Sequence, residues 1–138
     1  MRTFLLRSDK ELRRALLLVL ALSGVSVAAL PTTSPMATRC GWFDNPTPGN
    51  ATLSDRDEDW IISMQGAHQA KGPWPRFNPK QWVRTGVGSA GYGCACVKAS
   101  VDVSTQLVME IASSRPLPLS TCRKDPALRG KEPVNPLK

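Results

Sequence analysis

The chain has 138 residues, the length of one ordinary domain, and it carries 18 basic and 11 acidic residues. Its net charge of +7 comes without a dense basic stripe interleaved with aromatic residues, so the composition argues against a nucleic-acid-binding protein. One histidine is present, and no phosphate loop or nucleotide fingerprint is recognisable. The sequence therefore predicts no catalytic residue, no metal site and no cofactor.

Residues 1–29 have the pattern of a secretory signal peptide. A basic segment ends at Arg14, an apolar run covers Ala15–Leu22, and small residues lead to Ala29, after which we expect cleavage. The apolar run is shorter than the ~20 residues that a spanning helix needs, so no membrane span should remain after cleavage. The exported part keeps 13 of the 18 basic and nine of the 11 acidic residues, and we expect it to be periplasmic or secreted.

The chain has four cysteines, and all lie in the exported part: Cys40, Cys94, Cys96 and Cys122. An even count in an oxidising compartment indicates two disulfides. A bond between Cys94 and Cys96 is disfavoured, because residues i and i+2 of a strand lie roughly 6–7 Å apart at their Cα atoms. Their one-residue spacing is also shorter than that of zinc-binding thiolates. Each should pair with one of the two distant cysteines, Cys40 and Cys122, and both ways of pairing them are possible.

The first part of the exported chain is rich in proline and turn residues. Residues 30–38 form a linker without periodicity, and residues 39–50 predict an irregular loop, whose Trp42 and Phe43 enter the core. Residues 51–54 predict a short strand.

A charged segment, Asp55–Asp59, follows. Its alternating carboxylates are similar to the start of a calcium loop, but Trp60 stands where such a loop needs glycine and Gly66 where it needs glutamate. We therefore interpret the segment as a charged hairpin turn. The next strand, residues 60–65, places Trp60, Ile62 and Met64 on one face.

Residues 91–103 show the clearest strand pattern. From Ala95 to Val103 the odd-numbered positions are apolar, while Cys94 and Cys96 lie on the opposite face. This strand should form a hairpin with residues 107–111 through a turn at 104–106. Residues 81–85 predict another short strand, and no amphipathic helix is expected in the exported part.

These elements predict a mainly β protein. About five short strands should form a small antiparallel sheet or a partly closed barrel, with its loops stapled by disulfides. After Cys122 the chain should fray, with residues 129–138 as a flexible tail.

The loop before residue 81 offers the one candidate binding site. Trp74 stands between Pro73 and Pro75, where a rigid aromatic side chain could stack on a sugar ring or dock into a partner's pocket. Arg76 could supply a planar cation beside it, suited to an acidic or hydroxyl-rich ligand. In the alternative, Trp74 folds back as a plug of the loop. The lone His68 lies in a polar loop and is expected to be solvated.

Several motifs resemble the exported bacterial proteins of the DUF4087 family. They lie at Arg39–Ala51, at Asp55–Asp57 ahead of Trp60–Ile62, at Gly91–Cys96 and at Cys122–Leu128. The resemblance covers residues 39–128 and implies an exported domain of unassigned function, with no catalytic residues to carry over. Glu58 stands where many members have glycine, so this turn could be wider here.

Three functions are compatible with these observations. The first is a non-catalytic binding or structural module of the cell envelope, with an envelope protein or a glycan as partner. The second is a protein inhibitor of a secreted hydrolase, which rests on fold-level analogy alone. The third is a small envelope enzyme, which the lone histidine makes the least supported.

Overall fold

The computed structural model describes residue 28 and residues 33–138. Apart from Ala28, the predicted signal peptide lies outside the described residues, as do residues 30–32 of the predicted linker. Among the described residues, no helix has both the length and the apolar character needed to cross a membrane.

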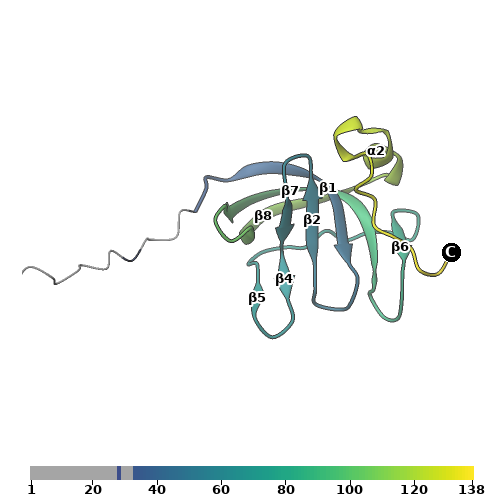
Figure 1. Cartoon of the computed structure of the whole chain (residues 1–138), viewed down its shortest axis with the longest axis horizontal. Helices are drawn as coiled ribbons and strands as arrows, with labels where there is room; N and C mark the ends of the chain where they lie inside the picture. Colours follow the sequence, from purple (N-terminus) through teal and green to yellow (C-terminus); the bar gives the residue numbers. More distant parts are fainter. Residues whose placement is uncertain (1–27, 29–32) are drawn as a thin grey trace, which may run out of the picture. The chain divides into compact units, whose positions relative to one another are not determined.

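The described chain is mainly β (Figure 1). Its strands are β1 (Ala37–Asn45), β2 (Thr52–Asp55), β3 (Asp59–Ile61), β4 (Ser63–Met64), β5 (His68–Gln69), β6 (Trp82–Arg84), β7 (Gly91–Asp102) and β8 (Leu107–Leu117). A short helix, α2 (Leu119–Lys124), and a single 3₁₀ turn, η1 (Pro126–Leu128), follow β8.

Five of the strands close into a ring. The order is β1-β2-β3-β8-β7, and β7 pairs again with β1. All neighbours are antiparallel except β3 and β8, which are parallel at Ile61 and Leu107. A hairpin of β4 and β5 lies apart from the ring, while β6 pairs with the first residues of β7. The result is a five-stranded barrel of mixed strand direction, which leaves few unpaired strand edges.

The predicted mainly β class is confirmed, with three corrections. Residues 39–50 do not form a loop throughout, because β1 already begins at Ala37 and pairs with two strands. The sheet is mixed rather than antiparallel, since β3 runs alongside β8 in the same direction. The hairpin of β7 and β8 is confirmed, but β8 continues beyond Ile111 to Leu117.

The helix α2 is a further correction, because no helix was expected here. It has only six residues, and its sequence carries no apolar periodicity long enough to detect. Cys122 is its one buried residue, so the helix is held by its cysteine rather than by an apolar face. The strand predicted at residues 60–65 is divided at Ile62 into β3 and β4, which leaves Met64 39% exposed.

Two clusters of buried side chains lie on opposite faces of β1 and β7. The inward residues of β7 pack inside the barrel with Phe43, Leu53 and Trp60. The outer cluster contains Trp42 and Tyr92 with both cysteines of β7, and Leu128 of η1 packs with it. Neighbouring residues of a strand point to opposite faces, so Trp42 and Phe43 enter different clusters. Both are buried, as predicted.

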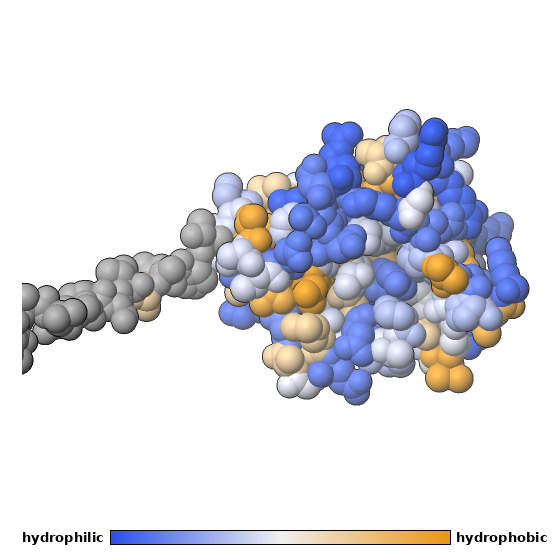
Figure 2. All heavy atoms as spheres, viewed as in Figure 1, coloured by the Kyte–Doolittle hydropathy of each residue, from blue (hydrophilic) through white to orange (hydrophobic). Residues whose placement is uncertain are grey.

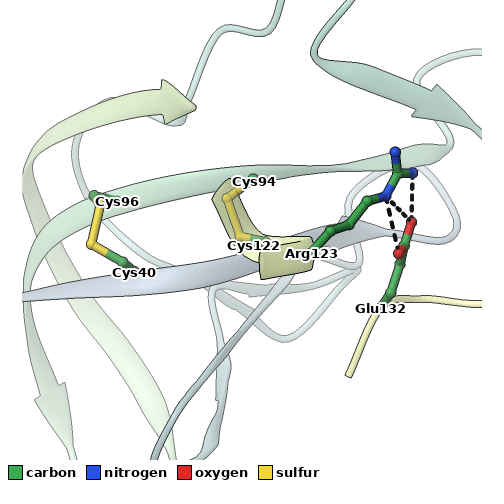
Figure 3. The surroundings of a disulfide bond; sticks show 6 residues. All are labelled: Cys40, Cys94, Cys96, Cys122, Arg123 and Glu132. Carbon is green, nitrogen blue, oxygen red and sulfur yellow. Dashed lines mark hydrogen bonds and ion pairs between the residues drawn. A yellow bond between two sulfur atoms is a disulfide. The ribbon is translucent and has the colours of Figure 1, made fainter. Parts of the chain in front are cut away.

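Two disulfides hold this outer side, and together they use all four cysteines (Figure 3). Cys40 and Cys96 face each other directly on β1 and β7 and are bonded. Cys94 bonds to Cys122 and so ties α2 to β7. The prediction that Cys94 and Cys96 have separate distant partners is confirmed.

Asp55 at the end of β2 organises the turn that follows. It is 2% exposed, and its carboxylate accepts hydrogen bonds from Arg39, from the Trp60 indole and from the backbone N–H groups of Asp57 and Glu58. The Arg39 guanidinium also lies 4.1 Å from the centre of the Trp60 ring. Burial raises the pKa of Asp55, but these hydrogen bonds outweigh it and the pKa is lowered. The predicted charged turn is therefore built around a buried carboxylate.

The C-terminal residues also contact the domain. Glu132 accepts hydrogen bonds from the Arg123 guanidinium, as short as 2.7 Å (Figure 3). It also accepts one from the Tyr92 hydroxyl at 3.0 Å. Chiefly through the bond from Arg123, the pKa of Glu132 is lowered. Lys131 donates to the carbonyl oxygen of Asp55. The structure thus places the first residues of the predicted flexible tail against the barrel.

Candidate functional site

A hollow of about 620 Å³ opens beside the end of β1, the loop at residues 74–79 and β6. Four aromatic side chains line it: Phe43, Trp74, Phe77 and Trp82. Its polar lining consists of Asn45, Asn78, Arg84 and Ser89. The hollow is thus largely aromatic, with amide and hydroxyl groups and a single cation, and no carboxylate lines it.

The four rings form one contacting group around Phe43. Its ring centre lies 5.8 Å from that of Trp74, 5.7 Å from that of Phe77 and 6.3 Å from that of Trp82. Phe77 and Trp82 are closer still, at 4.9 Å. Phe43 is buried, whereas the other three are only partly buried. The hollow therefore has a rigid aromatic floor, and three rings are left with part of their surface open.

Two buried polar atoms of this lining have no hydrogen-bond partner. They are the indole Nε1 of Trp74, a donor, and the amide Oδ1 of Asn45, an acceptor. The amide nitrogen of Asn45 is satisfied, because it donates to the carbonyl and hydroxyl oxygens of Ser89. A buried polar group without a partner costs about 1–3 kcal/mol, so a ligand that reaches either atom recovers free energy. Both atoms are shielded in the structure, so reaching them requires a small side-chain movement.

The local sequence explains how these side chains meet. Phe43 and Asn45 are two residues apart on β1, as are Trp82 and Arg84 on β6, so each pair shares one face of its strand. The prolines at 73, 75 and 79 exclude regular structure in the loop between them.

Two glycines of β7 make room for the rings. A Cβ atom at Gly91 would overlap the indole of Trp82, and one at Gly93 would overlap Phe77 and the carbonyl oxygen of Gln81. The Gly91-Tyr92-Gly93 motif, conspicuous in the sequence, is therefore a space requirement of the aromatic floor.

Of the two positions considered for Trp74, the structure supports the inward one. The side chain is partly buried and packs edge-on against Phe43, yet it also lines the hollow. Arg76 is exposed and lines a second hollow, of about 390 Å³, together with Trp74. The two candidate residues, Trp74 and Arg76, therefore lie at adjoining hollows, and Trp74 takes the inward of the two positions that the sequence left open.

The sequence pattern does not indicate most of the lining. It predicts Phe43 as a core residue and residues 81–85, which include Trp82, as a short strand. Phe77 and Trp82 could have been found from the paired glycines of β7, because glycines at alternate strand positions indicate close approach of another segment. No sequence signal points to Asn45.

The single histidine of the chain, His68, forms a hydrogen bond within the domain. The Nε2 of His68 donates a hydrogen bond to the carbonyl oxygen of Val108 at 2.9 Å, so this histidine is bonded rather than solvated.

In the part of the chain that the structure describes, no three His, Cys, Asp or Glu side chains gather as metal ligands would. Figure 2 shows hydrophobic residues in small separate areas among hydrophilic ones on the face that it displays.

The comparison with protein families identifies the family of this domain. The model of a protein family of unknown function, DUF4087, matches residues 34–129. The chain belongs to the DUF4087 family. The match includes the whole barrel from β1 to η1, both disulfides and every residue that lines the hollow.

Membership of DUF4087 confirms the resemblance seen in the sequence, and the matched range begins five residues before the predicted boundary at residue 39. No curated protein matches the chain, and no solved structure does. The function must therefore be argued from the site itself.

Proposed function

We propose that this DUF4087 protein is an exported, non-catalytic binding module that holds a saccharide in its aromatic hollow. The observation that carries the proposal is the combination of three partly open aromatic rings with one unpaired donor and one unpaired acceptor in the same lining.

The aromatic rings suit a sugar ring. The carbon-bound hydrogens of a pyranose form an apolar face, which packs on an indole or phenyl ring. Trp74, Phe77 and Trp82 each offer such a surface, and Phe43 holds all three in place from beneath. A hollow of this size accommodates one or two sugar rings, within the volume range of ordinary ligand pockets.

The unpaired atoms favour a hydroxyl-bearing ligand over a purely apolar one. A hydroxyl group both donates and accepts, so one type of ligand group can serve the Trp74 N–H and the Asn45 oxygen. An apolar side chain of a protein partner would leave both atoms unpaired, so the free energy of about 1–3 kcal/mol per atom would not be recovered. This difference supports the glycan over the envelope protein as partner.

Binding is favoured over catalysis by the same lining. Its polar side chains are two amides, a hydroxyl and a guanidinium, and none of these is an acid or base suited to proton transfer near neutral pH. The Ser89 hydroxyl accepts from Asn45 and has no neighbouring base among the lining residues.

Export is part of the proposal and rests on two observations. Residues 1–29 have the order of a signal peptide, and all four cysteines are paired, which an oxidising compartment would maintain. A periplasmic or secreted location would also bring the hollow into contact with envelope glycans.

The test is saccharide binding by the exported protein recovered from its host. A glycan array selects ligands, and titration calorimetry measures their affinity. Trp74→Phe keeps an aromatic ring but removes the indole N–H, so it should weaken binding about fivefold, as expected for one lost hydrogen bond of ~1 kcal/mol. Met64→Ala, at an exposed position of β4 outside the hollow, is the matched control and should bind like the parent.

Two results would contradict the proposal. One is that no saccharide binds, while a single envelope protein is retained by the immobilised domain. The other is that Trp74→Phe and Met64→Ala bind every selected saccharide equally, which would place the ligand elsewhere.

A further inference from the structure

A second hollow continues the first across Trp74. It has a volume of about 390 Å³, and Gln69 and Arg76 supply its polar side chains. Trp74 and Pro75 line both hollows, so these two residues form a shared wall between them. A ligand that occupies both must extend over this wall, which suits a chain of at least two linked rings.

Each hollow has one guanidinium at its border. Arg84 of β6 lines the first and Arg76 lines the second, and both side chains are exposed. Among the described residues, the ion pairs are Arg39 with Asp55 and Arg123 with Glu132, so neither border arginine is neutralised by a carboxylate. Neither forms a side-chain hydrogen bond to a described residue. Both cations are free to bind a ligand.

The sequence around the hollows is free of acidic residues over a long stretch. No aspartate or glutamate occurs between Asp59 and Asp102, whereas five basic residues do: Lys71, Arg76, Lys80, Arg84 and Lys98. The loop at residues 74–79 and β6 both belong to this stretch. The charge of the segment is therefore complementary to an anionic ligand.

From these observations we infer that the saccharide is acidic and spans both hollows. The inference rests on the proposed function and adds the ligand class. Each guanidinium binds a carboxylate or sulfate group of a sugar unit, because its planar fork of N–H donors matches such groups in two-point contacts. The rings stack on the aromatic side chains, and the units join over Trp74. A neutral saccharide would gain the stacking but not the charge-assisted bonds.

Calorimetry with defined oligosaccharides tests this inference. The probes are a tetramer of galacturonate, a neutral tetramer of galactose and a sulfated galactose tetramer, measured with the exported protein at low and at physiological salt. We expect an acidic tetramer to bind at least about tenfold more tightly than the neutral one, the effect of one charge-assisted hydrogen bond. The preference should shrink as salt rises, because the arginines are exposed. The uronate and sulfate arms decide which anion is preferred.

Three charge-removing variants locate the effect. Arg84→Gln and Arg76→Gln should each lower affinity for the preferred acidic tetramer by about fivefold to tenfold and leave affinity for the neutral one unchanged. Lys98→Gln is the matched control: Lys98 is an exposed residue of β7 that lines neither hollow, and its loss should change affinity less than twofold.

The possible outcomes separate the two proposals. Equal affinity for neutral and acidic tetramers would overturn the inference while the saccharide-binding function stands. Equal losses in all three variants would also overturn it, since the effect would then come from overall charge. Tighter binding of a four-nucleotide single-stranded DNA than of any acidic tetramer would overturn it in favour of a nucleic-acid ligand. If no saccharide binds, both proposals fail.

Discussion

The buried carboxylate of Asp55 offers the sharpest test of how this barrel is held together. One oxygen accepts the N–H groups of Asp57 and Glu58, both at 2.8 Å. The other accepts from Arg39 at 3.1 Å and from the Trp60 indole at 2.9 Å. In the variant Asp55→Asn an NH₂ group replaces one oxygen. Whichever oxygen it replaces, two of the four donors lose their acceptor and face another donor.

The size of the effect follows from these contacts. Hydrogen bonds to a charged group contribute about 1.5–3 kcal/mol each, so losing two should lower the free energy of unfolding by about 3–6 kcal/mol. That is a large part of the ~5–15 kcal/mol that stabilises a typical domain. At roughly 4 °C per kcal/mol for about 100 residues, the melting temperature should fall by roughly 12–24 °C.

The assay is denaturant unfolding followed by circular dichroism, with Asp57→Asn as the control. Asp57 is in the same turn, but it is exposed and its side chain has no hydrogen-bond partner among the described residues, so its substitution should cost less than ~0.5 kcal/mol. If the two variants unfold at the same denaturant concentration, the assignment of Asp55 as the organising group is refuted.

The pH dependence of stability gives a second test of the role of the Asp55 carboxylate. The pKa of Asp55 is lower in the folded than in the unfolded chain, where it is about 3.9. Its contribution to stability is therefore complete above about pH 4 and is lost as the pH falls through the folded pKa. The stability difference between the parent and Asp55→Asn should be constant near neutrality and shrink below about pH 4. A difference that stays constant under acid conditions would contradict the reasoning.

Three further predictions concern the fold and its export. Gly72→Ala should lower the free energy of unfolding by about 3 kcal/mol or more, because φ at Gly72 is +98° and a Cβ atom there would overlap a backbone carbonyl of β8. Gly66 has a φ of +79° but open space around it, so Gly66→Ala should cost only about 1–2 kcal/mol in the same unfolding assay. Replacing Cys94 and Cys122 with serine removes a disulfide between residues 28 apart in sequence and should lower the free energy of unfolding by about 3–4 kcal/mol. Hydrogen exchange in α2 should become faster, and unchanged exchange there would mean that the helix packs on the domain without its disulfide. Mass spectrometry of the exported protein should find Leu30 at its N-terminus, and an uncleaved chain in the membrane fraction would contradict the signal peptide.

Local patterns in the sequence were sufficient for the elements that depend on near neighbours. The alternation of β7 predicted its buried face, because side chains of a strand alternate between two faces whatever lies beyond them. The same geometry excluded a bond between Cys94 and Cys96 and so required two long-range disulfides. The hairpin of β7 and β8 followed from a turn of a few residues between two apolar patterns.

Pairing between distant segments could not be predicted. β1 looked like a loop because the proline- and glycine-rich residues 46–49, which follow it directly, masked a strand that is stabilised by β2 and β7 on its two edges. The parallel contact of β3 with β8 joins segments that are more than 40 residues apart, and no local pattern specifies it. The choice of Cys96 as the partner of Cys40 depended on the register of β1 against β7.

By itself, the sequence determined the mainly β class, the presence of two disulfides and the inward face of β7. Only the tertiary structure decided that the barrel closes and that the loop around Trp74 folds over the end of β1. Edge-on packing against Phe43 of β1 positions Trp74, and the space left by Gly91 and Gly93 of β7 admits Trp82 and Phe77 beside it; both strands are remote from Trp74 in sequence. A binding hollow is made of surfaces that the chain brings together from afar, so its lining appears only when the strands are paired.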